Sequence, residues 1–299
     1  QYRDYSEWLQ SEAQQKERQR QGEYWQDVFK GTLPVLELPY DRPRSTQNTS
    51  QGGVHSFHID QTTTDRLKEL SEAQGGTLFM SLLTTTGLWL SGLSGQDDII
   101  IGSPVACRRH SDVQELPGLF VNTLCFRLGT EATTLEEVFS SVRTAALGAF
   151  DHQEYGFEEL VTNLDVPRDM NRNPLFDVML VFQNQEMLAT DNPLYQLDSS
   201  LESDAPSKFD LLLNVSEDAS GLSVEITYNK DLFDSSTISA FSDYFQKITA
   251  QIKDGESSTR NIRSLLPEEI SYQLEELSGE EANYSCLLYT SDAADEFMG

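Results

Sequence analysis

Apolar residues recur along the chain at two spacings, which predict a mixture of strands and helices. Six segments either alternate apolar with polar residues or form short unbroken apolar runs, and both patterns are typical of strands. These segments are 53–59, 99–101, 120–128, 176–182, 209–215 and 222–229. The last two flank a Glu-Asp-Ala-Ser-Gly turn, which predicts a hairpin between neighbouring strands.

Other segments carry apolar residues at helical spacing. They are 6–29, 65–73, 77–90, 134–150 and 238–252. Gly31 supplies a stop after the first of them, and Thr134 with Glu137 has the spacing of a capping box. The segment 77–90 is apolar nearly all round, so we expect it to be buried. Helices and strands that mix throughout predict an α/β fold with a mixed β-sheet flanked by helices.

Two segments interrupt this pattern and are expected to be connectors. Two prolines exclude helix from 36–44, and a polar stretch follows them. A linker is expected at 256–263, after the last amphipathic helix. Residues 286–296, CLLYTSDAADE, resemble the translation of a sequencing-library adapter, so we leave 286–299 out of the fold and expect the natural sequence to end near Ser285.

The charge of the chain narrows its set of partners. It contains 21 Lys and Arg against 49 Asp and Glu, which gives a formal net charge of −28. Such a surface repels nucleic-acid phosphates and anionic lipid headgroups, and no apolar run reaches the roughly 18 residues that suggest a membrane span. We therefore expect a soluble protein with no nucleic acid and no membrane among its partners.

The start of the sequence and its cysteines point to the cytoplasm. The chain begins at Gln1 without a signal-peptide pattern, and we expect it to start inside a longer polypeptide. The cysteines, Cys107, Cys125 and Cys286, are odd in number and lack metal-type spacing, which argues against a disulfide framework. We expect Cys107 and Cys125 to be core thiols beside apolar strands.

Candidate chemistry from the residues alone is sparse. His55 and His58 are three apart on a predicted strand and should point to opposite faces, which disfavours a metal site. His110 follows two arginines in a polar loop and is read as a surface residue, whereas His152 ends a predicted helix and could orient a loop. Signatures of the common hydrolases, phosphate-binding loops and zinc proteases are absent from the sequence. On these grounds the chain is an α/β domain of unknown activity.

Seven segments, in order, resemble the later core motifs of condensation domains from nonribosomal peptide synthetases. They are YRDYSEW at 2–8, IGSPVACR at 101–108, LFVNTL at 119–124, HQEYGFE at 152–158, RDMNRNPLFD at 168–177, KFDL at 208–211 and DLFD at 231–234. Gly156 and Asn171 depart from the family pattern, which usually has Pro and Ser there. The resemblance covers roughly residues 1 to 285.

The resemblance implies a chloramphenicol acetyltransferase-like fold of two lobes. It divides the chain into the C-terminal lobe of a condensation domain at 1–255 and a linker toward an adenylation domain at 256–285. The family's catalytic His-His-x-x-x-Asp-Gly motif precedes its Tyr-x-Asp element and does not occur in this sequence. We therefore expect no catalytic residue in this chain, with the motif histidine upstream of Gln1 in a missing N-terminal lobe.

The intact domain, by this resemblance, joins a carrier-bound acyl or peptidyl thioester to a carrier-bound aminoacyl acceptor. Its partners would be upstream and downstream peptidyl carrier domains, whose phosphopantetheine arms hold the substrates, and an adjacent adenylation domain. No cofactor would bind the domain directly, and no metal is expected. The isolated chain is expected to be inactive. The block at 119–124 is similar to that of domains that accept an L-configured donor.

The resemblance also implies roles for individual residues. Arg108 matches the arginine that pairs with the hallmark aspartate, and Phe120, Val121 and Asn122 would lie near the tunnel between the lobes. His152, Arg168, Asp169 and Arg172 are expected to brace loops rather than touch substrate. Two alternatives stay open, namely an inactive carrier-docking or structural module and an epimerisation domain of the same superfamily.

Overall fold

The computed structural model describes residues 1–44, 51–164, 166, 172–183, 207–267 and 270. Its helices are α1 (Tyr2–Leu9), α2 (Glu12–Val28), α3 (Gln61–Ala73), α4 (Leu78–Ser94), η1 (Ser111–Val113), α5 (Leu135–Asp151), α6 (Phe157–Asn163), α7 (Ser235–Lys253) and α8 (Thr259–Arg263). Its strands are β1 (Gly52–Asp60), β2 (Asp98–Val105), β3 (Asn122–Gly129), β4 (Val178–Gln183), β5 (Leu211–Asp218) and β6 (Gly221–Asn229). All six predicted strands are confirmed.

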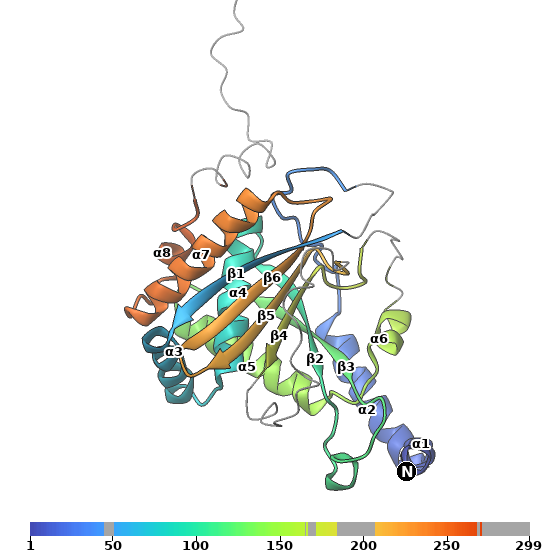
Figure 1. Ribbon diagram of the computed structural model, residues 1–299. Helices are drawn as coiled ribbons and strands as arrows, with labels where there is room; N and C mark the ends of the chain where they lie inside the picture. The colour runs from blue at the N-terminus through green and yellow to red at the C-terminus, as the bar shows by residue number, and fades with distance from the viewer. Residues whose placement is uncertain (45–50, 165, 167–171, 184–206, 268–269, 271–299) are drawn as a thin grey trace, which may run out of the picture.

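The described strands form one mixed sheet, as the sequence predicts. Their order is β1-β6-β5-β4-β2-β3, with β4 parallel to both β2 and β5 and the other neighbours antiparallel (Figure 1). The β5–β6 pair is the predicted hairpin. Strands β2 and β4 share only the positions Ile101↔Val178 and Gly102↔Met179. Gly102 is required there, because a Cβ at this position would stand 2.3 Å from the Phe176 ring.

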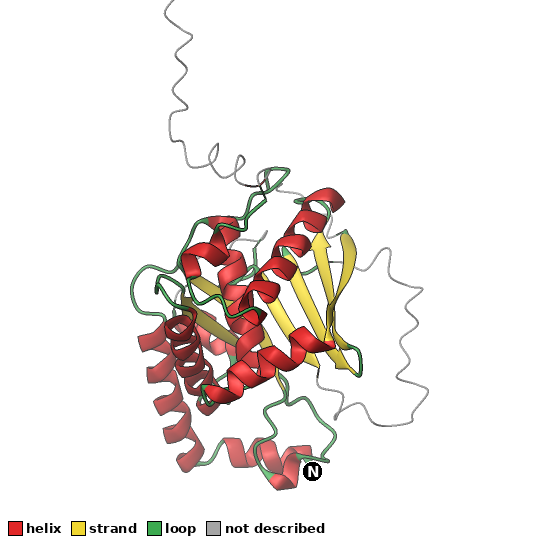
Figure 2. Cartoon of the chain, turned by 90° about the vertical axis from the view of Figure 1, so that its left-hand side faces the viewer, coloured by secondary structure: helices red, strands yellow, loops and turns green. Residues whose placement is uncertain are grey.

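Helices α3, α4, α5 and α7 cover one face of this sheet (Figures 1 and 2). The core lies between the two layers, and α4 runs through it with buried side chains on almost every side, as its apolar sequence predicts. Trp89 on α4 and Phe241 on α7 pack edge to face with ring centroids 6.1 Å apart. None of the helices among the described residues has the length and apolar character needed to cross a membrane.

The prediction of one continuous helix over 6–29 is wrong. The structure divides it into α1 and α2 at Ser11. The backbone of Ser11 is extended, and its side-chain oxygen accepts a hydrogen bond from the backbone amide of Gln14. A serine can bond local backbone groups and so start a new helix, which outweighs the helical propensity of the residues around it. The break turns α1 away from the body of the molecule (Figure 1).

The segment 256–263, which the sequence predicts to be a connector, is packed against the domain. Ser257 O accepts from the Leu135 amide at 2.7 Å, and Thr259 N donates to Thr133 O at 3.2 Å. Ile262 is fully buried, and Arg263 pairs with Asp97 at 2.7 Å. The linker proposed at 256–285 therefore begins with residues that are fastened to the domain. The adapter-like segment 286–299 lies outside the described residues.

Candidate functional site

The loop after β2 is shaped by Arg108. Its Nη1 donates to the carbonyl oxygens of Gln114 and Leu116 at 3.2 and 2.8 Å and makes a further short bond to that of Val113. The guanidinium also lies over the Phe120 ring, 4.3 Å from its centroid. A planar cation with several donors can hold such a loop because it satisfies several carbonyls at once. Among the described residues Arg108 donates from Nη1 alone, which leaves Nε and Nη2 available.

Asn122, at the start of β3, joins this loop to the turn after α5. Its Nδ2 donates to the carbonyl oxygens of Gln153 and Tyr155, both at 2.8 Å, and its Oδ1 accepts from the Phe157 amide at 3.1 Å. The Cys107 thiol also donates to Gln153 O, at 3.1 Å. One amide side chain thus fixes the whole 153–157 turn beside the 107–122 loop.

The other two residues expected near a tunnel differ in exposure. Phe120 is buried and contacts the rings of Tyr2 and Tyr5, with centroids 5.3 and 5.0 Å away. Val121 is 63% exposed, and its neighbour Leu119 is 78% exposed. Helix α1 lies beside this loop, and Tyr2 Oη donates to Leu119 O at 3.0 Å (Figure 1). The loop and α1 therefore present an apolar surface together.

His152 forms the C-terminal cap of α5 and holds α2 against it. Its Nδ1 bonds Gly148 O at 2.7 Å, so Nδ1 carries the proton and Nε2 accepts from Arg20 Nη1 at 3.0 Å. The ring stacks on Tyr24 with centroids 3.9 Å apart, and the His152 carbonyl accepts from Trp25 Nε1 at 2.9 Å. Both ring nitrogens are occupied, so this imidazole has a structural position rather than that of an acid or base.

Two ion pairs secure the residues that enter β4 and β5. Arg172 makes a bidentate bond to Asp177 at 3.0 and 2.8 Å and also donates to Leu36 O at 2.7 Å. Arg44 pairs with Asp210, which also accepts from Tyr40 Oη at 2.9 Å. Burial raises the pKa of Asp177 despite the opposing effect of Arg172. The other two residues expected to brace loops, Arg168 and Asp169, lie outside the described residues.

The remaining histidines take up separate positions. His55 Nε2 bonds Ser242 Oγ at 2.9 Å, whereas His58 Nε2 bonds Ser220 O at 3.1 Å, so the two do not converge on one ligand. His110 is exposed and lies edge to face with Trp8, with ring centroids 4.9 Å apart. Within the described ranges, His, Cys, Asp and Glu side chains form no group of three that could hold a metal ion.

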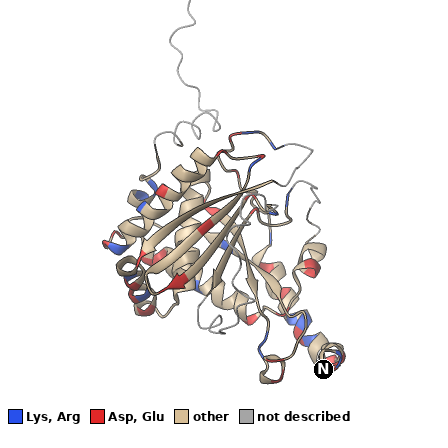
Figure 3. Cartoon of the chain, in the orientation of Figure 1, with Lys and Arg blue, Asp and Glu red and all other residues tan. Residues whose placement is uncertain are grey.

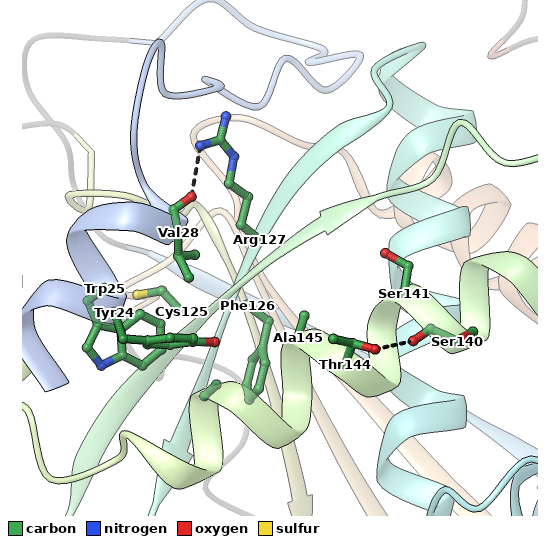
Figure 4. A pocket seen from close by; sticks show the side chains of 11 residues that line it. Tyr24, Trp25, Val28, Cys125, Phe126, Arg127, Ser140, Ser141, Thr144 and Ala145 are labelled. Carbon is green, nitrogen blue, oxygen red and sulfur yellow. Dashed lines mark hydrogen bonds between the residues drawn. The ribbon is translucent and has the colours of Figure 1, made fainter. Parts of the chain in front are cut away.

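Several cavities border this region, and three of them bear on the predicted residues. The first, of about 260 Å³, lies between α1, α2, the 107–122 loop and the 153–157 turn, and it includes Phe120, Val121 and Asn122. The second, of about 410 Å³, lies between α2, β3 and α5 (Figure 4), where Arg127 donates to Val28 O at 3.1 Å. The third, of about 860 Å³, is lined by 33–35, α6 and the segment that carries Arg172. The first is therefore the cavity that brings the expected tunnel residues together.

Two polar residues of this first cavity, Gln21 and Glu154, could not be singled out from the sequence. In the sequence Glu154 is only one member of a motif, and Gln21 looks like one of many polar positions on an exposed helix. The structure makes Gln21 1% exposed, because α2 packs against the turn that holds Glu154. No periodicity in the sequence signals this burial, since it depends on how α2 and the turn meet in space.

Solved structures share the fold of this chain. The crystal structure of the X-domain from teicoplanin biosynthesis has a TM-score of 0.74 and 22% identity, over 89% of this chain and 62% of that one. A four-domain nonribosomal peptide synthetase bound to AMP and glycine has a TM-score of 0.73 and 21% identity, over 86% of this chain and 21% of that one. The condensation domain from Monacolin K polyketide synthase MokA has a TM-score of 0.68 and 16% identity, over 84% of this chain and 61% of that one. The class is thus the chloramphenicol acetyltransferase-like fold of condensation domains, as expected.

Sequence comparison then gives the family. The condensation domain family model matches residues 1–274, and a plipastatin synthase of Bacillus subtilis (strain 168) is 41% identical over 271 residues. Surfactin synthase subunit 2 of the same organism is 39% identical over 257 residues. These alignments cover 90% and 85% of this chain but only 8% and 7% of the two relatives. The chain belongs to the condensation domain family of nonribosomal peptide synthetases.

Proposed function

We propose that this chain is part of an acyltransferase that forms an amide bond between two carrier-bound substrates. The amine of an aminoacyl acceptor attacks the carbonyl carbon of an acyl or peptidyl thioester. The new C–N bond forms as the C–S bond breaks, the donor's phosphopantetheine leaves as a thiol, and the amine loses a proton. The observation that carries this proposal is the family match over residues 1–274.

The chain's own residues would contribute a wall of the reaction chamber. We propose that Phe120, Val121 and Asn122 line the substrate tunnel, because they border the 260 Å³ cavity beside the exposed apolar surface of Leu119 and Val121. Residues 1–255 would form the C-terminal lobe, and 256–285 would lead toward an adenylation domain. Upstream and downstream carrier domains would deliver the substrates.

The imidazole that such chemistry uses would come from outside this sequence. In the proposal it belongs to a His-His-x-x-x-Asp-Gly motif in an N-terminal lobe that packs on α1 and the 107–122 loop. Arg108 supports this placement, because its Nε and Nη2 have no partner among the described residues and could bind the motif's aspartate bidentately. Its Nη1 would meanwhile keep the loop in position.

The test is an amide-forming assay with the natural polypeptide that extends this sequence upstream. One carrier domain is loaded with an acyl donor and a second with an aminoacyl acceptor, and the masses of both carriers are then measured. The proposal expects the acyl group to move onto the acceptor carrier. When both masses stay the same, chiral analysis of the released acceptor amino acid decides: unchanged configuration would leave the docking-module interpretation, and inverted configuration would favour epimerisation.

A further inference from the structure

The 260 Å³ cavity contains a buried acceptor with no donor opposite it. Gln21 is 1% exposed, and its Oε1 has no hydrogen-bond partner among the described residues. Its Nε2 donates to Glu17 Oε1 at 3.0 Å and, more weakly, to Glu154 Oε2 at 3.5 Å. Turning the amide over would bring its oxygen against both carboxylates, so the present orientation is the stable one. The cavity therefore lacks a donor for this oxygen.

Glu154 adds a negative charge to the same cavity. The carboxylate is half-buried and forms no ion pair within the part of the chain that the structure describes. Its charge reaches the neighbouring groups, because it contributes, after burial, to raising the pKa of Tyr5 and of Cys107. A partly desolvated carboxylate is stabilised by a cation within hydrogen-bond reach.

The other charges that line the cavity are already balanced. Glu17 pairs with Arg20 at 2.6 Å, and this bond lowers the pKa of Glu17 to about 2. Arg18 pairs with Glu159, with its Nε 2.7 Å from Oε2. Acidic and basic positions are mixed along α1 and α2 (Figure 3), and the pairs they form leave Glu154 uncompensated. Among the described residues, the cavity is therefore left with one unpaired negative charge, on Glu154, and one neutral acceptor without a donor, Gln21 Oε1.

We propose that Glu154 and Gln21 Oε1 form a subsite for a primary ammonium group. This group is the α-ammonium of the aminoacyl acceptor, an assignment that rests on the proposed function. An ammonium supplies three donors and one positive charge. It satisfies both groups together once the Gln21 side chain shifts toward the cavity, because the structure leaves Oε1 with almost no accessible surface. The rings of Tyr2 and Tyr5 offer apolar surface to the carbon atoms that carry it. The subsite holds the acceptor in its resting, protonated form, so Glu154 is a positioning residue and not the base.

The experiment compares two probes that differ only in the ammonium group, leucinamide and 4-methylpentanamide. Each is titrated into the ¹⁵N-labelled 299-residue chain at pH 6.5, below the usual α-amino pKa of about 7.7–8.0, and binding is followed by NMR. Wild type should bind leucinamide at least about tenfold more tightly, the smallest factor expected for a hydrogen bond to a charged group. Glu154→Gln and Gln21→Met should each bring the two affinities close together.

Glu158→Gln is the matched control, because it removes a carboxylate from the same segment but outside this cavity. It should keep the wild-type preference, and unchanged melting temperatures identify folded variants. The subsite is overturned if wild type binds the two probes with equal affinity or binds neither. It is also overturned if the preference for leucinamide survives in both Glu154→Gln and Gln21→Met. The readout is binding, so these outcomes leave the amide-forming assay to be judged separately.

Discussion

At the scale of single residues, Asn122 carries more of the candidate site than its type suggests. Its three hydrogen bonds end on backbone groups of Gln153, Tyr155 and Phe157. Asn122→Ala should lower the free energy of unfolding by about 1–3 kcal/mol, because buried backbone groups lose their partners. Urea denaturation measures the change. Gln26→Ala, at an exposed helix position, should stay within about 0.5 kcal/mol, and equal losses in both variants would contradict this role.

Cys107 should be unreactive at neutral pH. Burial raises its thiol pKa to about 11, and burial also raises the pKa of Cys125. The thiolate is the reactive form, so in a Cys286→Ser chain at pH 8 both thiols should react with Ellman's reagent roughly a hundredfold more slowly than in urea. The ratio should shrink as the pH rises from about 9 toward 11. A native Cys107 that reacts at the denatured rate at pH 8 would exclude this environment.

At the scale of elements, replacing Gly156 with proline, the residue that the family usually has there, should stabilise the chain. It caps α6 with φ −64° and ψ 136°, a Cβ there would meet open space, and its amide donates to no described residue. Gly156→Pro should therefore raise the free energy of unfolding by about 0.4–1 kcal/mol, since proline restricts the unfolded chain. Gly31→Pro is the control and should destabilise, because Gly31 has φ 87°. Thermal melts decide, and a loss of stability in Gly156→Pro would contradict the argument.

The elements themselves were largely predictable because their signals are local. Thr134 and Glu137 form the capping box that their spacing predicts, and the alternation in 53–59 gives an edge strand. The errors lie where a local signal was weak. Ser11 split a helix that composition alone would continue, and Thr259 and Ile262 joined the core from a segment that looked like linker.

At the scale of the whole molecule, the candidate site was only partly predictable. The motif residues Arg108, Asn122 and His152 lie in or beside the 107–122 loop and the 153–157 turn, but most of their partners are backbone carbonyls that no sequence pattern reveals. Gln21 became a site residue only through the packing of α2 on the 153–157 turn. Contacts between distant segments are set by tertiary geometry, which residue spacing does not encode.

The exposed apolar side chains of Leu119 and Val121 lie next to each other, and such a surface is typical of one side of a larger interface. We propose that this chain shapes a chamber whose catalytic imidazole lies elsewhere. The most direct test mixes donor-loaded and acceptor-loaded carrier domains with the 299-residue chain alone, and in parallel with its upstream-extended form, and measures the condensed product by mass spectrometry. We predict product only with the extended form. Product from the chain alone, above the rate without protein, would contradict the claim.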